Sequence, residues 1–289
     1  MMDKLYNTVA VVGPGLIGGS IGLGLRRRDV AERVVGIGRR ACSLDEALEV
    51  GAVDVATMDM EEGVRGADLV ILATPIRAIS AVIPTVARYM HHNAVLTEVA
   101  STKRSVITTI RTGLAERSDI IFIPTHPMAG SEQRGATHAS DDLFEDSVCI
   151  FTPLPETAPS ALKKLKDMWK TLGTVPYEMT PEEHDRTVAT VSHLPHLAAS
   201  CVARCVNARE GQFAGGGFID TTRIASGDPR LWRDICESNA DEVHDVLAHL
   251  IEQLQTLDDL FSDGDFDRIQ CFLADAKEKR DLIVKHLGD

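Results

Sequence analysis

Short apolar runs alternate with amphipathic stretches along the first half of the chain. The runs have the composition and length of buried parallel strands and cover residues 8–12, 34–37, 69–73, 94–97 and 120–123. The stretches between them have apolar residues at helical spacing and cover residues 17–28, 43–50, 77–90 and 103–116. Strands that alternate with helices at this spacing predict βαβ units and a parallel sheet.

The second half has a different pattern. Residues 147–152 and 174–179 predict two more strands, which flank a helix near 160–171. From Thr180 onwards the sequence predicts only helices, beginning with a threonine cap, a proline and two glutamates in the first turn. The predicted helices cover residues 181–209, 229–261 and 266–286, with breaks at the glycines of 215–217 and at 262–265.

These patterns predict an α/β fold in two parts. We expect a Rossmann-type nucleotide-binding domain with a mainly parallel sheet over residues 1–178, followed by an all-helical domain over residues 179–289. The length of 289 residues is sufficient for both.

Composition and charge exclude several classes of partner. The chain has 43 acidic and 30 basic residues, which gives a formal net charge of −13. Nucleic acids and anionic lipid surfaces select basic proteins, so we expect no nucleic-acid partner and no membrane partner. An anionic ligand must then be held by a local positive site.

Two further features favour a cytoplasmic protein. The six cysteines are scattered and form no Cys-x-x-Cys pair, which is typical of reduced thiols. Residues 5–25 carry no charge but contain six glycines and a proline, which makes them a poor membrane span or signal peptide.

The sequence Gly13-Pro14-Gly15-Leu16-Ile17-Gly18 follows the first predicted strand and opens the first predicted helix. In such a loop the first glycine permits a tight turn, the second lets the backbone approach a pyrophosphate, and the third allows close packing of helix and sheet. The helix N-terminus stabilises the anion. The alternative is a tight turn without a ligand. We expect a dinucleotide to be bound by Gly13, Gly15, Leu16, Ile17, Gly18 and Thr74.

The end of the second strand bears on the choice between NAD and NADP. NAD-binding proteins place an acidic residue there for the ribose 2′-hydroxyl, but this strand ends Gly36-Ile37-Gly38-Arg39-Arg40. Arg39 and Arg40 suit the 2′-phosphate of NADP, because guanidinium groups bind phosphate through two hydrogen bonds. We favour NADP over NAD. The alternative is that the two arginines form a solvated basic turn.

Two segments follow strands at the carboxyl edge of the sheet, where open α/β folds bind ligands. One is Glu98-Val99-Ala100-Ser101-Thr102-Lys103, and the other is Thr125-His126-Pro127-Met128-Ala129-Gly130-Ser131-Glu132. A histidine that titrates near neutral pH suits a base that takes a hydroxyl proton while a hydride leaves the same carbon. We expect Ser101 and His126 to meet near the nicotinamide. The alternative for each is an ordinary loop residue.

The helical half contains two polar motifs. Ser192-His193-Leu194-Pro195-His196 places two imidazoles three residues apart, but zinc would need a third ligand, so we expect no metal. Further along, Arg223 follows the glycines of 215–217 and precedes Trp232. In an acidic chain this arginine predicts a carboxylate site. The alternative is a surface arginine paired with Asp220.

Six segments, in this order, resemble the prephenate/arogenate dehydrogenases of tyrosine biosynthesis, the TyrA family. They are GPGLIGGS, ASTK, THPMAGSE, SHLPH, GGGFIDTTRIA and DPRLW, and the resemblance extends to about Asn239. It implies an NAD(P)-dependent oxidoreductase that acts on a CH–CH group. The reaction would be the oxidative decarboxylation of prephenate to 4-hydroxyphenylpyruvate, or of arogenate to tyrosine.

The resemblance also implies roles for single residues. His126 matches the catalytic histidine that accepts the proton of the substrate hydroxyl, and Ser101 matches the serine that binds the same hydroxyl. Arg223 matches the arginine that binds a substrate carboxylate. His193, Trp232 and Gly217 match residues around the side-chain end of the substrate pocket.

This chain differs from many of its relatives at one position that affects the choice of cofactor, and it shares with them a feature that affects its assembly. Many relatives have an aspartate at the position of Gly38, so its absence strengthens the prediction of NADP. Relatives dimerise through the helical half, and a homodimer is consistent with an apolar stripe whose alternative is an intramolecular core. The stripe consists of Leu247, Leu250, Ile251, Leu254, Leu257 and Leu260. Relatives often carry a fused chorismate mutase or a tyrosine-sensing domain, and we expect neither.

Other interpretations compete with this one. A β-hydroxyacid dehydrogenase would use a lysine base in its second domain, whereas this chain offers the His126 and Arg223 segments. A non-catalytic NADP sensor would be expected to lose the proton acceptor, but His126 and Ser101 are both present. Between the two substrates, His193 favours prephenate slightly, because only an acidic residue would select the ammonium group of arogenate.

Overall fold

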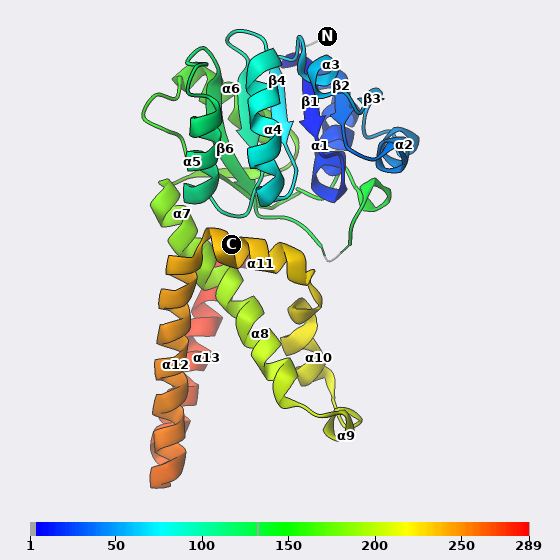
Figure 1. Ribbon diagram of the computed structural model, residues 1–289. Coiled ribbons are helices and arrows are strands. Elements are labelled where there is room, and N and C mark those ends of the chain that lie inside the picture. The colour runs from blue at the N-terminus through cyan, green and yellow to red at the C-terminus, as the bar shows by residue number, and fades with distance from the viewer. Residues whose placement is uncertain (1–3, 132, 289) are drawn as a thin grey trace. The chain divides into compact units, whose positions relative to one another are not determined.

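The structure is a computed structural model that describes residues 4–131 and 133–288 (Figure 1). Glu132, which ends the THPMAGSE segment, lies outside the described residues. The chain forms two compact units, of which the first ends at Ala240 and the second begins at Asp241. All candidate site residues belong to the first unit.

The first unit is built on one eight-stranded sheet in the order β3-β2-β1-β4-β5-β6-β7-β8. Strands β1 to β6 are parallel, β7 is antiparallel to β6, and β8 is parallel to β7. The strands are β1 Tyr6–Val12, β2 Ala31–Ile37, β3 Val55–Thr57, β4 Leu69–Leu72, β5 Val95–Glu98, β6 Ile121–Pro127, β7 Val148–Phe151 and β8 Val175–Glu178. The predicted α/β fold with a mainly parallel sheet is confirmed.

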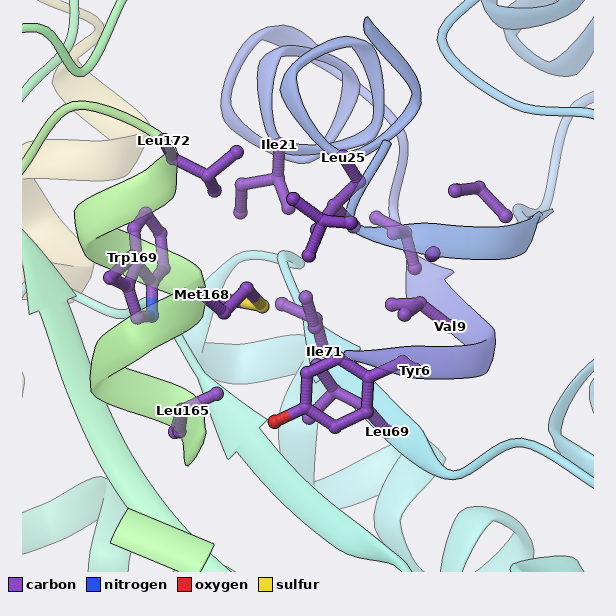
Figure 2. Packing of buried hydrophobic residues seen from close by; sticks show 14 of the residues in the cluster. Tyr6, Val9, Ile21, Leu25, Leu69, Ile71, Leu165, Met168, Trp169 and Leu172 are labelled. Carbon is purple, nitrogen blue, oxygen red and sulfur yellow. The ribbon is translucent and has the colours of Figure 1, made fainter. Parts of the chain in front are cut away.

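Helices cover both faces of this sheet. They are α1 Leu16–Arg27, α2 Ala41–Glu49, α3 Met60–Val64, α4 Ile76–Tyr89, α5 Arg104–Gly113 and α6 Pro159–Thr171, with a short 3-10 helix η1 at Ala136–His138. On one face Val9 packs in a cluster with Ile21 of α1 and Trp169 of α6 (Figure 2). The next residue of β1, Ala10, packs on the other face with Ile79 of α4. Alternate residues of β1 thus face two separate cores.

Strand β3 and helix α3 were not predicted. β3 has three residues and lies at the edge of the sheet, so it is too short to show a hydrophobic period. α3 has five residues and begins at Asp59, whose carboxylate accepts hydrogen bonds from the backbone N–H groups of Glu61 and Glu62. Strand pairing and capping establish these two short elements.

The predicted helical pattern over residues 181–209 is confirmed for most of its length, but it is divided into several helical segments. α7, Pro181–Val188, leads into a π-helical turn, η2, at Ala189–His193, and then into α8, Leu194–Cys205. Pro195 accounts for the wider turn, because it has no N–H group and its ring collides with the carbonyl group four residues earlier. π turns are frequent at functional sites, and this one ends at His193. A separate short helix, α9, covers Ala208–Gly211.

The predicted helical pattern over residues 229–261 is formed by two helices. α11, Pro229–Ser238, ends at Asn239, where φ is −133°, and α12, Ala240–Asp263, follows. The Asn239 side chain is fully buried and forms hydrogen bonds within the first unit. A tertiary contact therefore interrupts a sequence pattern that would otherwise continue.

The second unit contains most of α12 and all of α13, Phe266–Gly288, which are joined by a turn at Gly264 with φ +66°. In the apolar stripe of α12, Leu260 is buried, whereas Ile251 and Leu254 are 57% and 56% exposed. No helix within the described ranges is long and apolar enough to cross a membrane.

Candidate active site

The glycine loop has the geometry that a dinucleotide requires. Gly13 has φ +90°, which glycine adopts readily, and a Cβ atom there would lie 2.8 Å from the Ala73 carbonyl oxygen. A Cβ atom on Gly18 would lie 2.3 Å from the Gly13 oxygen. A Cβ atom on Gly15 would meet no atom within 4 Å. The first and third glycines are therefore needed for packing, and the second leaves the backbone open to a ligand.

The N-terminus of α1 lies beside this loop. It has no side-chain cap and no acidic residue in its first turn, so the positive end of the helix dipole at Leu16 and Ile17 can receive an anion. Thr74 follows β4, and its Cγ2 lies 3.0 Å from a Cβ atom built on Gly13. Its hydroxyl oxygen is buried and has no hydrogen-bond partner among the described residues. The helix N-terminus and the unpartnered hydroxyl both fit a pyrophosphate.

The end of β2 carries positive charge. Gly38 is half-buried, and a Cβ atom there would approach Leu44 Cδ2 at 3.0 Å. Arg39 is exposed and forms no hydrogen bond or ion pair within the part of the chain that the structure describes. Arg40 donates a hydrogen bond to Ser43 Oγ at 2.7 Å. Neither arginine is paired with a carboxylate among these residues, so both charges are available to a ligand.

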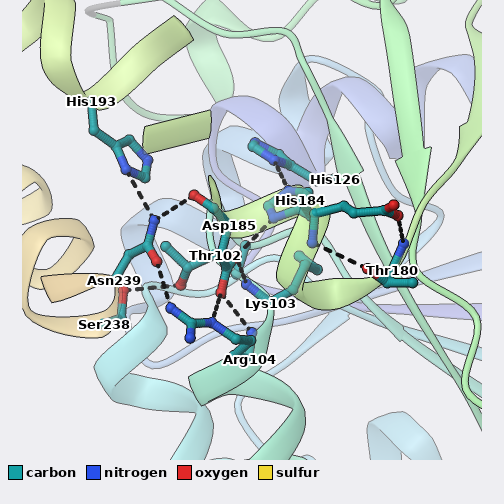
Figure 3. Close-up of polar contacts among 12 residues, drawn as sticks. Thr102, Lys103, Arg104, His126, Thr180, His184, Asp185, His193, Ser238 and Asn239 are labelled. Carbon is teal, nitrogen blue, oxygen red and sulfur yellow. Dashed lines mark hydrogen bonds and ion pairs between the residues drawn. The ribbon is translucent and has the colours of Figure 1, made fainter. Parts of the chain in front are cut away.

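His126 is the next-to-last residue of strand β6 and does not lie in a loop. The strand extends past residue 123, where we expected its end. Residues 125–127 pair with β7, and His126 lies opposite Ile150. Its half-buried ring contacts His184 of α7, with His126 Nδ1 2.8 Å from His184 Nε2 (Figure 3). His184 Nδ1 lies 2.8 Å from Asp185 Oδ1. We call His126, His184 and Asp185 the histidine relay.

The hydrogen bonds of the histidine relay determine which ring nitrogens carry a proton. Burial alone would raise the pKa of Asp185, but hydrogen bonds from His184 and from the backbone of Arg104 and Lys103 hold this pKa below its usual value. The ionised carboxylate accepts a hydrogen bond from Nδ1–H of His184. His184 Nε2 then accepts one from Nδ1–H of His126. Nε2 of His126 is left with its lone pair, as a base requires.

Burial also keeps both imidazoles neutral. It lowers the pKa of His126 well below the ordinary value, and the electrostatic effects of His184, Lys103 and His193 act in the same direction. Burial likewise lowers the pKa of His184.

Asp185 also anchors the segment that carries Ser101. Its Oδ1 accepts a hydrogen bond from the backbone N–H of Lys103 at 2.7 Å, and its Oδ2 accepts one from that of Arg104 at 2.9 Å. Ser101 lies two residues before this anchor, is half-buried, and makes no hydrogen bond to the described residues. The Asp185 carboxylate therefore orients His126 through His184 and also anchors the segment that carries the Ser101 hydroxyl.

A buried ion pair connects the end of β5 to the start of α5 and is hydrogen-bonded to β6. The side chains of Lys103 and Glu98 are both fully buried and form an ion pair. The Lys103 ammonium also donates a hydrogen bond to the Thr125 carbonyl oxygen at 2.6 Å, directly before His126. Because breaking a buried ion pair leaves an unpaired charge, this contact holds the strand end rigidly.

His193 is fixed by Asn239, the residue at which α11 ends. Asn239 Nδ2 donates a hydrogen bond to the Asp185 carbonyl oxygen at 2.8 Å and lies 3.5 Å from His193 Nδ1. Burial lowers the pKa of His193 to about 4, so its imidazole is neutral. Trp232 of α11 lies beside it, with ring centroids 6.1 Å apart and planes at 85°.

Arg223 and Gly217 lie on exposed segments. Gly217 lies within α10, Gly216–Thr222, instead of the loop that we predicted, and Arg223 begins the 3-10 helix η3, Arg223–Ser226. Both elements pack against α8. The Arg223 side chain forms no hydrogen bond or ion pair with any described residue, Asp220 included. Among the described residues, the rings of His193 and Trp232 are in contact, while no hydrogen bond, ion pair or ring contact joins Arg223 or Gly217 to them or to His126.

Sequence reasoning missed His184, Asp185 and Asn239. The predicted threonine cap of α7 is confirmed, and the cap sequence is followed directly by adjacent His and Asp, which was the available signal. Nothing local indicates the contact itself, because His126 and His184 are 58 positions apart. Over the described ranges, no group of three His, Cys, Asp or Glu side chains is placed to hold a metal ion.

Two protein-family models match the chain. The model described as "Prephenate dehydrogenase, nucleotide-binding domain" matches residues 21–178, and "Prephenate dehydrogenase, dimerization domain" matches residues 180–275. A prephenate dehydrogenase of Bacillus subtilis is 33% identical over 97% of this chain and 77% of its own length.

Solved structures agree with these matches. Prephenate dehydrogenase from A. aeolicus, in complex with hydroxyphenyl propionate and NAD+, has a TM-score of 0.87 and 30% identity, covering 96% of this chain and 98% of that one. Synechocystis arogenate dehydrogenase has a TM-score of 0.81 and 29% identity, covering 95% and 99%. The chain therefore belongs to the prephenate dehydrogenase family and is a dehydrogenase, an oxidoreductase with a nucleotide-binding domain.

Proposed function

We propose that the chain converts prephenate to 4-hydroxyphenylpyruvate by oxidative decarboxylation, with NADP as the preferred cofactor. The histidine relay carries this proposal, because it leaves Nε2 of His126 as a neutral, oriented proton acceptor. The glycine loop follows the carboxyl end of β1, and His126 lies at the carboxyl end of β6, which runs parallel to β5, so they share one edge of the sheet.

The relay performs the proton step. The substrate ring carries a hydroxyl group opposite a carbon that bears a carboxylate. His126 Nε2 accepts the hydroxyl proton while a hydride leaves the same carbon. The carboxylate leaves as carbon dioxide, its bonding electrons make the ring aromatic, and the resulting phenolate oxygen takes the proton back to give the hydroxyl group of the product. The chemistry that a bound nicotinamide supplies is acceptance of the hydride. His184 and Asp185 hold His126 in the required tautomer and stabilise the cation that it becomes.

The remaining residues bind and orient the substrate. The free hydroxyl of Ser101 binds the same substrate hydroxyl as His126, and the unpaired guanidinium of Arg223 binds a substrate carboxylate. His193, Trp232 and Gly217 surround the side-chain end. The neutral imidazole of His193 supports prephenate, because it offers no negative charge to the ammonium group of arogenate. Arogenate is the second candidate, supported by the likeness to Synechocystis arogenate dehydrogenase.

The cofactor proposal rests on the end of β2. Arg39 and Arg40 have no acidic partner among the described residues, and Gly38 offers no carboxylate to repel a 2′-phosphate. Gly13, Gly15, Leu16, Ile17, Gly18 and Thr74 would hold the pyrophosphate. NAD is the second candidate, since the A. aeolicus relative was solved with NAD+.

We also propose a cytoplasmic homodimer with a nucleotide-binding domain over residues 1–178 and a helical substrate-binding and dimerisation domain over residues 179–289. The matched dimerization domain and the exposed Ile251 and Leu254 support the dimer. The six cysteines, all free thiols, support a reducing compartment.

The test is formation of reduced cofactor by purified protein with each pairing of prephenate or arogenate with NADP or NAD. We expect the highest kcat/KM with prephenate and NADP. A preference for arogenate or NAD would replace that part of the proposal. Inactivity in all four pairings, from folded protein that binds NADP, would refute the proposed reaction.

A further inference from the structure

Helix α11 meets the nucleotide-binding part of the first unit through contacts that have no role in the site as described so far. The helix packs against α4 and α5. It carries Trp232 in its first turn and ends at Asn239, whose side chain donates a hydrogen bond to the Asp185 carbonyl oxygen. α11 therefore connects the substrate end of the candidate site to the helices that follow β4 and β5.

Arg77 makes the charged contact between α4 and α11. It is the second residue of α4, and Thr74 and Pro75 lie directly before that helix. Arg77 Nε lies 3.0 Å from Asp234 Oδ1, and the guanidinium donates a hydrogen bond to the Glu237 carboxylate. Thr74, for which we propose a role in cofactor binding, is thus three residues from a side chain that binds α11 at two points.

The two carboxylates lie on a different side of α11 from Trp232. Asp234 and Glu237 are three residues apart, so they share one face of the helix. Trp232 precedes Asp234 by two residues, and two residues turn an α-helix by about 200°. One side of α11 therefore holds Trp232 in contact with His193, while another side is bound to α4.

A buried hydrogen bond joins the end of α11 to the segment that carries Ser101. Thr102 is fully buried, and its Oγ1 lies 2.9 Å from Ser238 Oγ. Ser238 donates its own hydroxyl proton to the Ile235 carbonyl oxygen, so Thr102 is the donor. This bond and those of Asn239 hold only the last residues of the helix. The contact of Arg77 with Asp234 supplies a further point of attachment along α11, without which the helix could pivot about its end.

Arg77 is not needed to neutralise Asp234. This carboxylate is 8% exposed and also accepts hydrogen bonds from two nitrogens of Arg233, at 3.0 and 2.6 Å. Removal of Arg77 therefore leaves no unpaired buried charge, which would otherwise cost much stability. Arg77 and Glu237 are both exposed, so their contact contributes little to the free energy of unfolding. The main consequence of the Arg77 contact is the placement of α11.

We propose that Arg77 is a positioning residue that couples cofactor binding to substrate binding. A cofactor bound at Thr74 fixes the first turn of α4, Arg77 extends this order to α11, and α11 holds Trp232 at the substrate end. The coupling is reciprocal, so each ligand raises the affinity for the other by the same factor. This inference rests on the proposed function, because it requires Thr74 to bind cofactor and Trp232 to border the substrate. It assigns no proton or hydride step to Arg77.

Oxidised cofactor and the product of the proposed reaction measure the coupling without turnover. The Kd of 4-hydroxyphenylpyruvate is determined by calorimetric titration of the protein alone and of the protein saturated with NADP. We expect NADP to lower this Kd about fivefold in the wild-type protein, the lower end of the usual range for two coupled sites. In Arg77→Gln this factor should fall below twofold, while the Kd of NADP alone should change less than twofold.

Two further variants separate the contact from its surroundings. Glu237→Gln weakens the same contact from the side of α11, at an exposed position, and should reduce the coupling factor in the same way. Arg88→Gln is the matched control, because it makes the same substitution in the last turn of α4, where the Arg88 side chain lies over the Tyr89 ring. The control should keep the fivefold factor.

A double-mutant cycle shows whether Arg77 and Glu237 act through one contact. Arg77→Gln should have little further effect on the coupling factor in a Glu237→Gln background. Additive effects, an unchanged factor in Arg77→Gln, or no coupling in the wild-type protein would each overturn the proposal. Thermal unfolding identifies the variants that fold, and any one folded variant of the contact suffices. Wild-type protein that is inactive with both substrates would refute the proposed function instead, so the two failures differ.

Discussion

The base end and the carboxylate end of the candidate site are built in different ways. At the base end, His184 and Asp185 are fully buried, and the Nδ1 atom of His126 has an assigned partner. At the carboxylate end, Arg223 is exposed on a four-residue helix and has no side-chain partner among the described residues. At the base end the hydrogen bonds form without a ligand, whereas at the carboxylate end the Arg223 guanidinium is left for a ligand to bind.

This difference follows from what each end must do. A base must present one lone pair in one direction, and buried hydrogen bonds achieve this because a misplaced proton would leave a buried polar group unsatisfied. An arginine that binds a carboxylate needs an unpaired guanidinium, which an internal ion pair would occupy. Substitutions at the base end should therefore change kcat, and those at the carboxylate end should change KM.

The largest effect is expected at His126. His126→Asn removes the proton acceptor, and kcat should fall by roughly two to four orders of magnitude, the usual range for a lost general base. Steady-state kinetics with saturating substrate and cofactor measure this, and cofactor binding serves as the control. Near-normal turnover would remove His126 from the role of base.

Arg223→Ala should have the next largest effect, and it should appear in KM. Loss of a charge-assisted hydrogen bond costs about 2 kcal/mol, which corresponds to roughly a thirtyfold increase in the substrate KM. The Kd of the cofactor should not change, because Arg223 lies outside the nucleotide-binding loop. Equal losses for substrate and cofactor would contradict the carboxylate assignment.

His184 tests the relay through kcat. His184→Phe leaves Nδ1–H of His126 without an acceptor, and kcat should fall roughly tenfold with little change in KM. His184→Gln retains an amide oxygen that can accept this hydrogen bond and should recover part of the loss. Identical losses in the two variants would show that the ring packs at this position without orienting His126.

The pH dependence of activity also tests the role of His126 as a base. The base must be unprotonated, so activity is lost as pH falls through the pKa of His126. Burial lowers that pKa, and the acid limb of kcat/KM should therefore lie below about 6.5, the ordinary value for histidine. An acid limb above 6.5 would contradict a desolvated base.

An effect no larger than that at His184 is expected at the end of β2, and it should be confined to one cofactor. Replacement of both Arg39 and Arg40 by alanine should raise the KM for NADP by roughly tenfold and leave the KM for NAD unchanged, because only NADP carries the 2′-phosphate. Both guanidinium groups are exposed, which limits the effect. Unchanged kinetics with NADP would mean that the arginines form a solvated turn.

The sequence predictions were accurate for elements that are determined by residues close together in the chain, and less accurate for elements that depend on tertiary contacts. The strands β1 to β6, apart from the short β3, show their hydrophobic runs within a few residues, and the glycine loop follows the first strand directly. The π turn before Pro195 and the helix end at Asn239 were missed. The first depends on a wider turn that the chain tolerates around proline, and the second on a buried side chain that bonds to α7.

By itself the sequence determined the order of strands and helices, the glycine loop and the residues that carry the family resemblance, because these depend on short-range spacing and residue type. Only the tertiary structure decided that His184 and Asp185 form a hydrogen-bonded chain with His126, and this chain determines which nitrogen of His126 is free. It also decided that the Arg223 side chain has no partner among the described residues. Those properties depend on burial and on hydrogen bonds between segments far apart in the chain, and only the folded sheet edge brings these segments together.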